Sequence, residues 1–150
     1  MLKKTITFKN ILGEDDTVDA YFNLNNIEYL RVSAKFGIKG DLVKGLKALL
    51  NTEDVDGMLK AVEGIVLAAY GVRPNNDSSG FIKTEEATQI FSASEPYSVM
   101  MMELINDPAV LNDFVKKLTE GIKANPANGE EKTAQSAVQP LTNSGVNPNA

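Results

Sequence analysis

The chain has 150 residues, of which 43% are hydrophobic, and this length and content suit one compact domain. It contains no His, Cys or Trp, which excludes a histidine general base, a thiolate nucleophile, a disulfide and a zinc site with nitrogen or sulfur ligands. The net charge of −5 argues against a general nucleic-acid binder, whose surface would be basic.

Two alternating stretches at the start of the chain predict an antiparallel β-hairpin. In Lys3–Asn10, Ile6 and Phe8 alternate with threonines, and a second alternating stretch runs from Val18 to Leu24. The polar segment Gly13–Asp16 between them is typical of a turn. The face of the second strand that we expect to point toward the core consists of Val18, Ala20, Phe22 and Leu24. Because a lone hairpin is marginal in water, helices must cover it.

Two short helices are expected next. Asn25 and Glu28 form a capping-box pattern at the start of a helix that reaches about Phe36. We expect its inward face to consist of Ile27, Leu30 and Ala34. Asp41 can cap a second helix, whose apolar stripe contains Leu42, Leu46, Leu49 and Leu50.

The third helix has the clearest periodicity in the chain. Gly71 and Pro74 follow its last apolar residue and are typical of a helix end. The apolar positions fit helical spacing without a gap and are Val55, Met58, Leu59, Val62, Val66 and Ala69.

Three further helices complete the predicted domain. Thr84 caps one that carries Ala87, Ile90 and Phe91, and Ser94–Pro96 begins another. Asp107 and Pro108 begin the last, whose inward side chains are Val110, Leu111, Phe114, Val115 and Leu118. The predicted fold class is therefore α+β and mainly α-helical. It has an N-terminal antiparallel β-hairpin packed on a bundle of about five to six short helices, all within residues 1–121.

Residues 122–150 are expected to form a flexible, low-complexity tail. The segment 124–150 contains five Asn and three Pro residues and no aromatic residue, so it cannot bury enough surface to order itself.

No targeting or membrane segment is predicted. The residues after Met1 are polar and alternating, unlike a signal peptide, and the longest strongly apolar run, Ile65–Tyr70, is far shorter than the ~20 residues of a membrane span. We therefore expect a cytosolic protein without a membrane partner.

Charge is distributed unevenly along the chain. The stretch from Arg31 to Lys47 has a net charge of +4, whereas the stretch from Thr84 to Val115 has six carboxylates and no Lys or Arg. Charge runs usually cover solvated helix faces. The alternative is a partner surface, including association of copies of this chain through opposite charges, which would weaken with salt.

A loop before the fourth helix resembles a calcium loop. Asn75, Asp77, Ser79 and Glu86 fall at positions 1, 3, 5 and 12 of an EF-hand-like pattern. Against this, Asn replaces the usual first Asp, Lys83 occupies a ligand position, and the break at 71–74 interrupts the incoming helix. A polar loop before a Thr-capped helix is the alternative, so no metal or other cofactor is assigned.

The stretch from Tyr97 to Ile105 is apolar on nearly all sides. Such a helix is either sandwiched in the core or meets a partner, and its three consecutive methionines are typical of adaptable binding surfaces. The candidate partner-binding residues are Tyr97, Met100, Met101, Met102 and Leu104. No catalytic residue is assigned.

Several of these residues together resemble the tail assembly chaperone family of long-tailed (siphovirus-type) bacteriophages. The resemblance covers about residues 1–121, including the strand that ends in Tyr21–Leu24. Its carboxy-terminal signature is carried by Phe81-Ile82-Lys83, Phe91, Tyr97-Ser98, Met102-Glu103-Leu104, Asp107 and Phe114.

The resemblance implies a non-enzymatic function. A member of this family binds the tape measure protein and keeps it assembly-competent until tail tube subunits polymerise around it. The resemblance also implies that the protein acts in the host cytoplasm and is absent from the mature virion. A structural virion protein, of the tail or of head completion, is the alternative.

Overall fold

The computed structural model describes residues 1–74 and 80–122 of the chain. Strands β1 (Leu2–Lys9) and β2 (Asp15–Phe22) form the expected antiparallel hairpin, with Leu2 opposite Phe22 and Lys9 opposite Asp15. A two-residue strand, β3 (Tyr70–Gly71), pairs with the end of β2 and gives the strand order β1-β2-β3. The sequence pattern did not predict this third strand, because two residues are too few to show alternation.

Six helices follow the hairpin within the described residues, which confirms the predicted α+β, mainly helical class. Their bounds are α1 (Asn26–Lys35), α2 (Leu42–Leu50), α3 (Val55–Ala69), α4 (Glu85–Ser92), α5 (Glu95–Asn106) and α6 (Pro108–Thr119). Each helix begins after a residue whose side chain accepts a hydrogen bond from a backbone N–H of the first turn, the pattern expected of a helix cap. These caps are Asn25, Asp41, Asp54, Thr84, Ser94 and Asp107.

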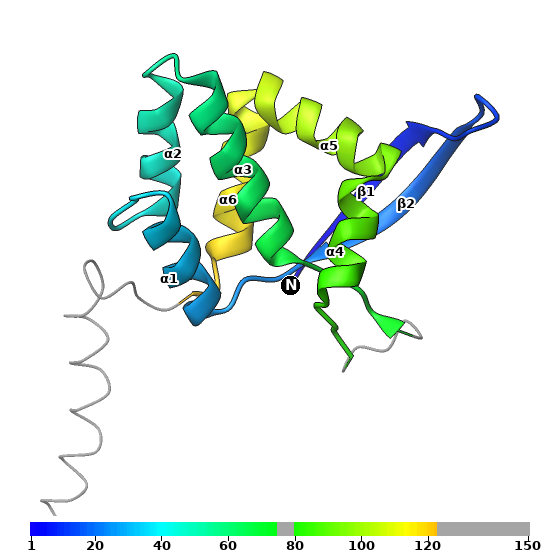
Figure 1. The fold of residues 1–150 in the computed structure, drawn as a ribbon, viewed down its shortest axis with the longest axis horizontal. Coiled ribbons are helices and arrows are strands. Elements are labelled where there is room, and N and C mark those ends of the chain that lie inside the picture. Colours follow the sequence, from blue (N-terminus) through cyan, green and yellow to red (C-terminus); the bar gives the residue numbers. More distant parts are fainter. Residues whose placement is uncertain (75–79, 123–150) are drawn as a thin grey trace, which may run out of the picture.

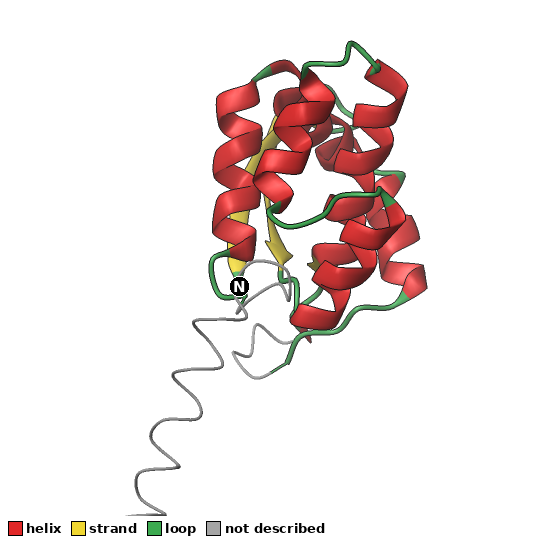
Figure 2. Cartoon of the chain, turned by 90° about the vertical axis from the view of Figure 1, so that its left-hand side faces the viewer, coloured by secondary structure: helices red, strands yellow, loops and turns green. Residues whose placement is uncertain are grey.

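Helix α5 extends between the upper end of α3 and strand β1 (Figure 1). It packs against β1, α6, α3 and α4, while α1 and α2 pack against α3 on the side away from the hairpin. Figure 2, seen from the side of α1 and α2, shows the strands behind the helices. The helices therefore cover one side of the hairpin, as a marginal two-stranded unit requires.

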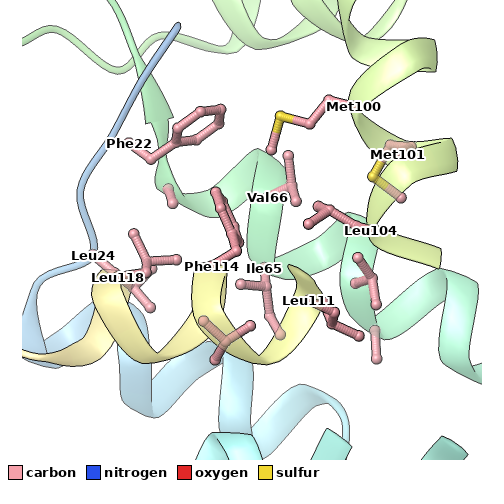
Figure 3. Close-up of a cluster of buried hydrophobic side chains, with 14 of the residues drawn as sticks. Phe22, Leu24, Ile65, Val66, Met100, Met101, Leu104, Leu111, Phe114 and Leu118 are labelled. Atoms are coloured by element: carbon pink, nitrogen blue, oxygen red, sulfur yellow. The ribbon is translucent and has the colours of Figure 1, made fainter. Parts of the chain in front are cut away.

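Phe22 is the centre of an aromatic cluster in the core. Its side chain is fully buried, and its ring makes edge contacts with Tyr70, Phe91 and Phe114 at centroid distances of 5.9, 6.1 and 5.3 Å. Tyr70 and Phe91 stack at 4.0 Å, and Tyr97 meets the edge of Phe91 at 5.4 Å. Figure 3 shows Phe22 and Phe114 facing the aliphatic side chains of α3 and α5. One continuous core therefore joins the hairpin to the helices.

The predicted inward face of α1 is wrong. Ile27 and Leu30 are 55% and 38% exposed, and Ala34 is exposed as well, whereas the buried residues are Tyr29, Val32 and Ser33. The Tyr29 hydroxyl accepts a hydrogen bond from the backbone N–H of Leu42 and donates one to the carbonyl of Gly40. The hydroxyl of Tyr29 therefore fixes the orientation of α1. A prediction based on the spacing of aliphatic residues does not include this hydrogen-bonding group.

Other residues expected in the core lie at its edges. Helix α5 packs against β1, so it covers Ile6 and leaves Val18, opposite Ile6 on β2, 39% exposed. Four of the six residues expected on the inward face of α3 are buried, but Val55 and Leu59 are 67% and 41% exposed, because Ala61 and Ile65 lie on that face in their place. That face consists of Met58, Ala61, Val62, Ile65, Val66 and Ala69. Ile90 of α4 is also on the surface, at 66%.

None of the helices in these two described segments is long and apolar enough to cross a membrane.

Candidate functional site

Four of the five candidate partner-binding residues on α5 lie in the core. Tyr97, Met100, Met101 and Leu104 are each no more than 8% exposed, and Figure 3 shows the last three pointing into the buried cluster. Met102 faces the other way and is 58% exposed. The structure therefore brings four of these residues together as packing residues and leaves Met102 as the member that a partner can reach.

The hydroxyl of Tyr97 links α5 to α3. It donates a hydrogen bond to Oε2 of Glu63 at 2.5 Å. Burial raises the pKa of Tyr97, and the hydrogen bond to Glu63 and the negative charge of that carboxylate raise it further. The phenol consequently remains protonated in the ordinary pH range and keeps the proton that it donates to Glu63.

A largely apolar groove lies beside that contact, between α1 and α3. This α1–α3 groove has a volume of about 440 Å³ and is lined by Lys35, Phe36, Lys60, Glu63, Gly64, Leu67 and Ala68. Phe36 crosses α3 at Gly64, where an added Cβ would lie 2.5 Å from a ring carbon of Phe36. The ammonium of Lys35 lies 5.5 Å from the centre of the Phe36 ring. Gly64 therefore allows an aromatic ring to form one wall of the groove, with a cation beside it.

The hairpin tip, residues 10–14, presents two large aliphatic side chains to solvent. Ile11 is 100% exposed and Leu12 is 75% exposed. The loop that carries them is fixed by Asn10, whose side-chain oxygen accepts hydrogen bonds from the backbone N–H groups of Leu12 and Glu14 at 2.9 and 3.1 Å. Gly13 adopts a positive φ of 81° and donates its N–H to the Asn10 carbonyl. Two aliphatic residues directly before a turn glycine are the signal in the sequence, but the predicted turn comprised only the polar segment Gly13–Asp16.

Lys83 connects three elements that are distant in sequence. Its ammonium donates to the carbonyl oxygens of Asn23 and Ala68 at 2.5 and 3.0 Å and to Oε1 of Glu28 at 2.6 Å. The same Glu28 oxygen accepts the backbone N–H of Asn25 in the capping box of α1. Lys83 thus holds the end of the hairpin, the start of α1 and the end of α3 together.

The residues before Lys83 also have structural roles. Ile82 forms a two-hydrogen-bond bridge with Val72, and the Phe81 ring occupies the space where a side chain on Gly71 would lie. The segment Phe81–Lys83 therefore stabilises the fold.

The structure assigns no metal site to the residues of the predicted calcium loop that it describes. Asn75, Asp77 and Ser79 lie outside the described residues, whereas Glu86 is exposed in the first turn of α4. Within residues 1–74 and 80–122, no group of three or more His, Cys, Asp or Glu side chains is positioned to hold a metal ion.

The basic and acidic stretches do not pair with each other. The acidic stretch bonds elsewhere, for example Glu103 to Lys4 at 3.1 Å and Asp113 to Lys117 at 3.0 Å. All five cations of the basic stretch are exposed, and none forms an ion pair with another described residue. They are Arg31, Lys35, Lys39, Lys44 and Lys47. The side of the molecule formed by α1 and α2 is therefore basic.

Comparison with known proteins identifies the family. A family model described as phage tail assembly chaperone matches residues 1–144. No curated protein and no solved structure matches the chain. The family match covers nearly the whole sequence and implies a non-enzymatic role. Phe91, Tyr97 and Asp107, which belong to the signature that resembles this family, serve here as packing and cap residues. The chain belongs to the phage tail assembly chaperone family.

Proposed function

We propose that this chaperone binds the tape measure protein of a long-tailed phage and keeps it soluble until tail tube subunits polymerise around it. The observation that supports the proposal is that a member of this chaperone family presents large apolar side chains to solvent, among them Ile11, Leu12 and Met102. A long helical client exposes apolar stripes before assembly, and contact with such side chains would cover those stripes.

On α5, Met102 is the proposed contact with the client. Its flexible thioether side chain adapts to apolar surfaces of different shape. Tyr97, Met100, Met101 and Leu104 anchor the helix in the core and so position Met102 on the outside. In this proposal the four buried residues support the site, and Met102 touches the partner.

Co-expression with the tape measure protein tests this function. We expect Met102→Asp to reduce the fraction of client that remains soluble, because the added charge opposes apolar contact. Ile90→Asp is the matched control, since Ile90 is similarly exposed, at 66% against 58%, but lies on α4. Met101→Asp is unsuitable, because it would place a charge in the core.

A folded Met102→Asp protein that solubilises the client as well as the Ile90→Asp protein would contradict the proposed contact. If the wild-type chaperone does not raise the soluble fraction at all, the proposed function itself is wrong.

The proposed role places the protein in the host cytoplasm during assembly and outside the finished particle. Mass spectrometry of purified virions measures this directly. A chaperone that leaves is expected to be absent, whereas a structural tail or head-completion protein would be present in many copies.

A further inference from the structure

The α1–α3 groove is open to solvent in the part of the chain that the structure describes, although its walls are largely apolar. Phe36, Leu67 and Ala68 line it and are only partly buried. Its volume of about 440 Å³ falls within the ~300–1,000 Å³ range of protein sites that enclose an apolar ligand. Because contact between these walls and water is unfavourable, a short apolar segment that fills the groove gains stability.

The carboxy-terminal part of the chain contains a short segment of matching character, residues 138–141. In residues 123–150 the larger aliphatic side chains are Val138, Leu141 and Val146, and two of the three fall within this segment. The family model reaches residue 144, so it includes residues 138–141 but not Val146. We infer that residues 138–141, named here the tail segment, dock into the α1–α3 groove of the same molecule.

Pro140 suits the tail segment to this groove. Its ring fixes its own φ and disfavours helical backbone at Gln139, so the segment favours an extended form. Extended segments that contain proline bind grooves lined by aromatic rings. The ring of Phe36, which crosses α3 at Gly64, supplies such a wall.

The tail segment can reach the groove within one molecule. In both views of the fold the last described residues, after α6, lie at the end of the molecule where α1 begins (Figures 1 and 2). Val138 follows Ile122 by 16 residues, and a chain of that length spans up to about 50 Å when extended. A domain of about 120 residues has a radius of gyration of only ~14 Å. The linker is therefore long enough for an intramolecular contact.

Charge favours the same pairing. Lys35 and Lys60 lie on the rim of the groove, and Lys35 forms no ion pair with another described residue. Glu130 and Glu131 lie shortly before the tail segment and are followed by one cation, Lys132. The linker therefore carries excess negative charge toward a basic rim, which orients the segment.

Two carboxylates also lie near the groove, and both are engaged. Glu63 accepts the Tyr97 hydroxyl, and Asp56 pairs with Lys60 at 3.0 Å. Lys35 is therefore the main cation that the linker carboxylates can meet.

Docking makes the tail segment a cover for the groove. A tethered segment has an effective concentration of about 1 mM, so even a weak contact keeps the groove occupied. Another molecule can then enter the groove only by displacing the segment. This inference goes beyond the proposed function, because the contact is measured without any client.

A spin label on the full chain tests the contact. The chain contains no Cys, so Ser136→Cys carries one nitroxide, two residues before the tail segment. The label is expected to broaden the NMR amide signals of groove residues such as Lys35, Gly64 and Ala68. The signal of Ile11 should stay sharp, because the hairpin tip lies on the opposite side of the molecule (Figure 1).

Two tail variants in the labelled chain show whether the apolar side chains are responsible. Val138→Asp/Leu141→Asp is expected to lower the ratio of docked to undocked molecules at least about tenfold and so to sharpen the groove signals, because charges oppose apolar burial. Val146→Asp is the matched control. It makes the same kind of change at the third aliphatic residue, outside the tail segment, and should leave the broadening unchanged.

Charge reversal tests the orientation of the contact. Lys35→Glu/Lys60→Glu and Glu130→Lys/Glu131→Lys should each weaken the broadening, and their combination should restore it. Lys44→Glu/Lys47→Glu makes the same change in net charge on α2, away from the groove, and should have no effect.

A fluorescent dye tests whether the tail segment covers the groove. Anilinonaphthalene sulfonate binds exposed apolar surface. It should fluoresce more strongly with Val138→Asp/Leu141→Asp than with the wild type or Val146→Asp. Circular dichroism verifies that each variant is folded.

Four results would overturn the inference. They are sharp groove signals in the labelled wild type, broadening that survives Val138→Asp/Leu141→Asp, equal dye fluorescence for all three proteins, and broadening that arises between molecules. The last is measured by mixing spin-labelled chains with isotope-labelled chains that lack a spin label, and it would make a second copy the occupant. None of these results measures client solubilisation, so the two proposals fail separately.

Discussion

The ammonium nitrogen of Lys83 lies 2.6 Å from Oε1 of Glu28, and both side chains are about four-fifths buried, with exposed fractions of 23% and 21%. The pair is separated by 55 residues in sequence. Two backbone carbonyls complete the contacts of the ammonium, at Asn23 and Ala68. This arrangement makes Lys83 a connection between the hairpin, α1 and α3.

We predict that Lys83→Met destabilises the protein by about 2 kcal/mol. The substitution keeps the length of the side chain but leaves the Glu28 carboxylate and two carbonyls without their charged donor, and hydrogen bonds to charged groups contribute ~1.5–3 kcal/mol. Urea denaturation followed by circular dichroism measures the change. Lys60→Met is the control, because its pair with Asp56 is 68% and 74% exposed and such surface pairs contribute ~0–1 kcal/mol. Equal losses for the two variants would contradict the structural role of Lys83.

Tyr97→Phe is expected to lower stability by about 1 kcal/mol at neutral pH, because it removes the hydrogen bond to Glu63 while keeping the ring in the core. The pKa of Tyr97 is raised in the folded protein, so the unfolded chain loses this proton first as pH rises above about 10. The contribution of Tyr97 to the unfolding free energy of the wild type is therefore fully present below that pH and declines above it.

The unfolding free energies of the wild type and of Tyr97→Phe should consequently converge at alkaline pH. Unfolding free energies at about pH 8 and about pH 10.5 measure the difference between them. Tyr70, whose pKa is also raised by burial, is present in both proteins, so its effect cancels. A difference that stays constant or grows with pH would contradict the role assigned to Tyr97.

The two neighbouring methionines of α5 are expected to differ strongly in their contribution to stability. Met100 is fully buried, so Met100→Ala leaves a cavity and should cost ~2–5 kcal/mol. Met102 is 58% exposed, so Met102→Ala should change stability by less than about 0.5 kcal/mol. Thermal denaturation of the two variants measures the contrast. A large loss for Met102→Ala would show that this side chain packs within the molecule and is unavailable to a partner.

Much of the fold was predictable because its determinants are local. The capping side chains of Asn25, Asp41, Thr84 and Asp107 occur where the sequence pattern placed helix starts, and the hairpin follows from alternation over eight-residue strands. Caps and alternation act over a few residues, so they can be read without knowing what packs against them.

The inward faces were less predictable, because they depend on distant partners. Tyr29 turns inward since its hydroxyl meets Gly40 and Leu42, and Ile27 is displaced to the surface as a result. On α5 the apolar pattern was compatible with burial or with partner contact, and only packing against β1, α3, α4 and α6 distinguishes Met100 from Met102. The α1–α3 groove was not predicted, because it requires Phe36 to cross α3 at Gly64.

Gly13→Ala is expected to destabilise the hairpin tip locally. Gly13 has a positive φ of 81° and no atom within 4 Å of an added Cβ, so the cost is conformational, without a steric clash, and amounts to ~1–2 kcal/mol. Amide hydrogen exchange should become faster at Leu12 and Glu14, whose N–H groups bond to Asn10, and should stay unchanged in α3.

Gly121→Ala is the control, because Gly121 also has open space around it but no positive φ, and it should leave exchange at the tip unchanged. Unaltered exchange at Leu12 in Gly13→Ala would contradict this role, because it would mean that the loop conformation that exposes Ile11 and Leu12 does not depend on the glycine.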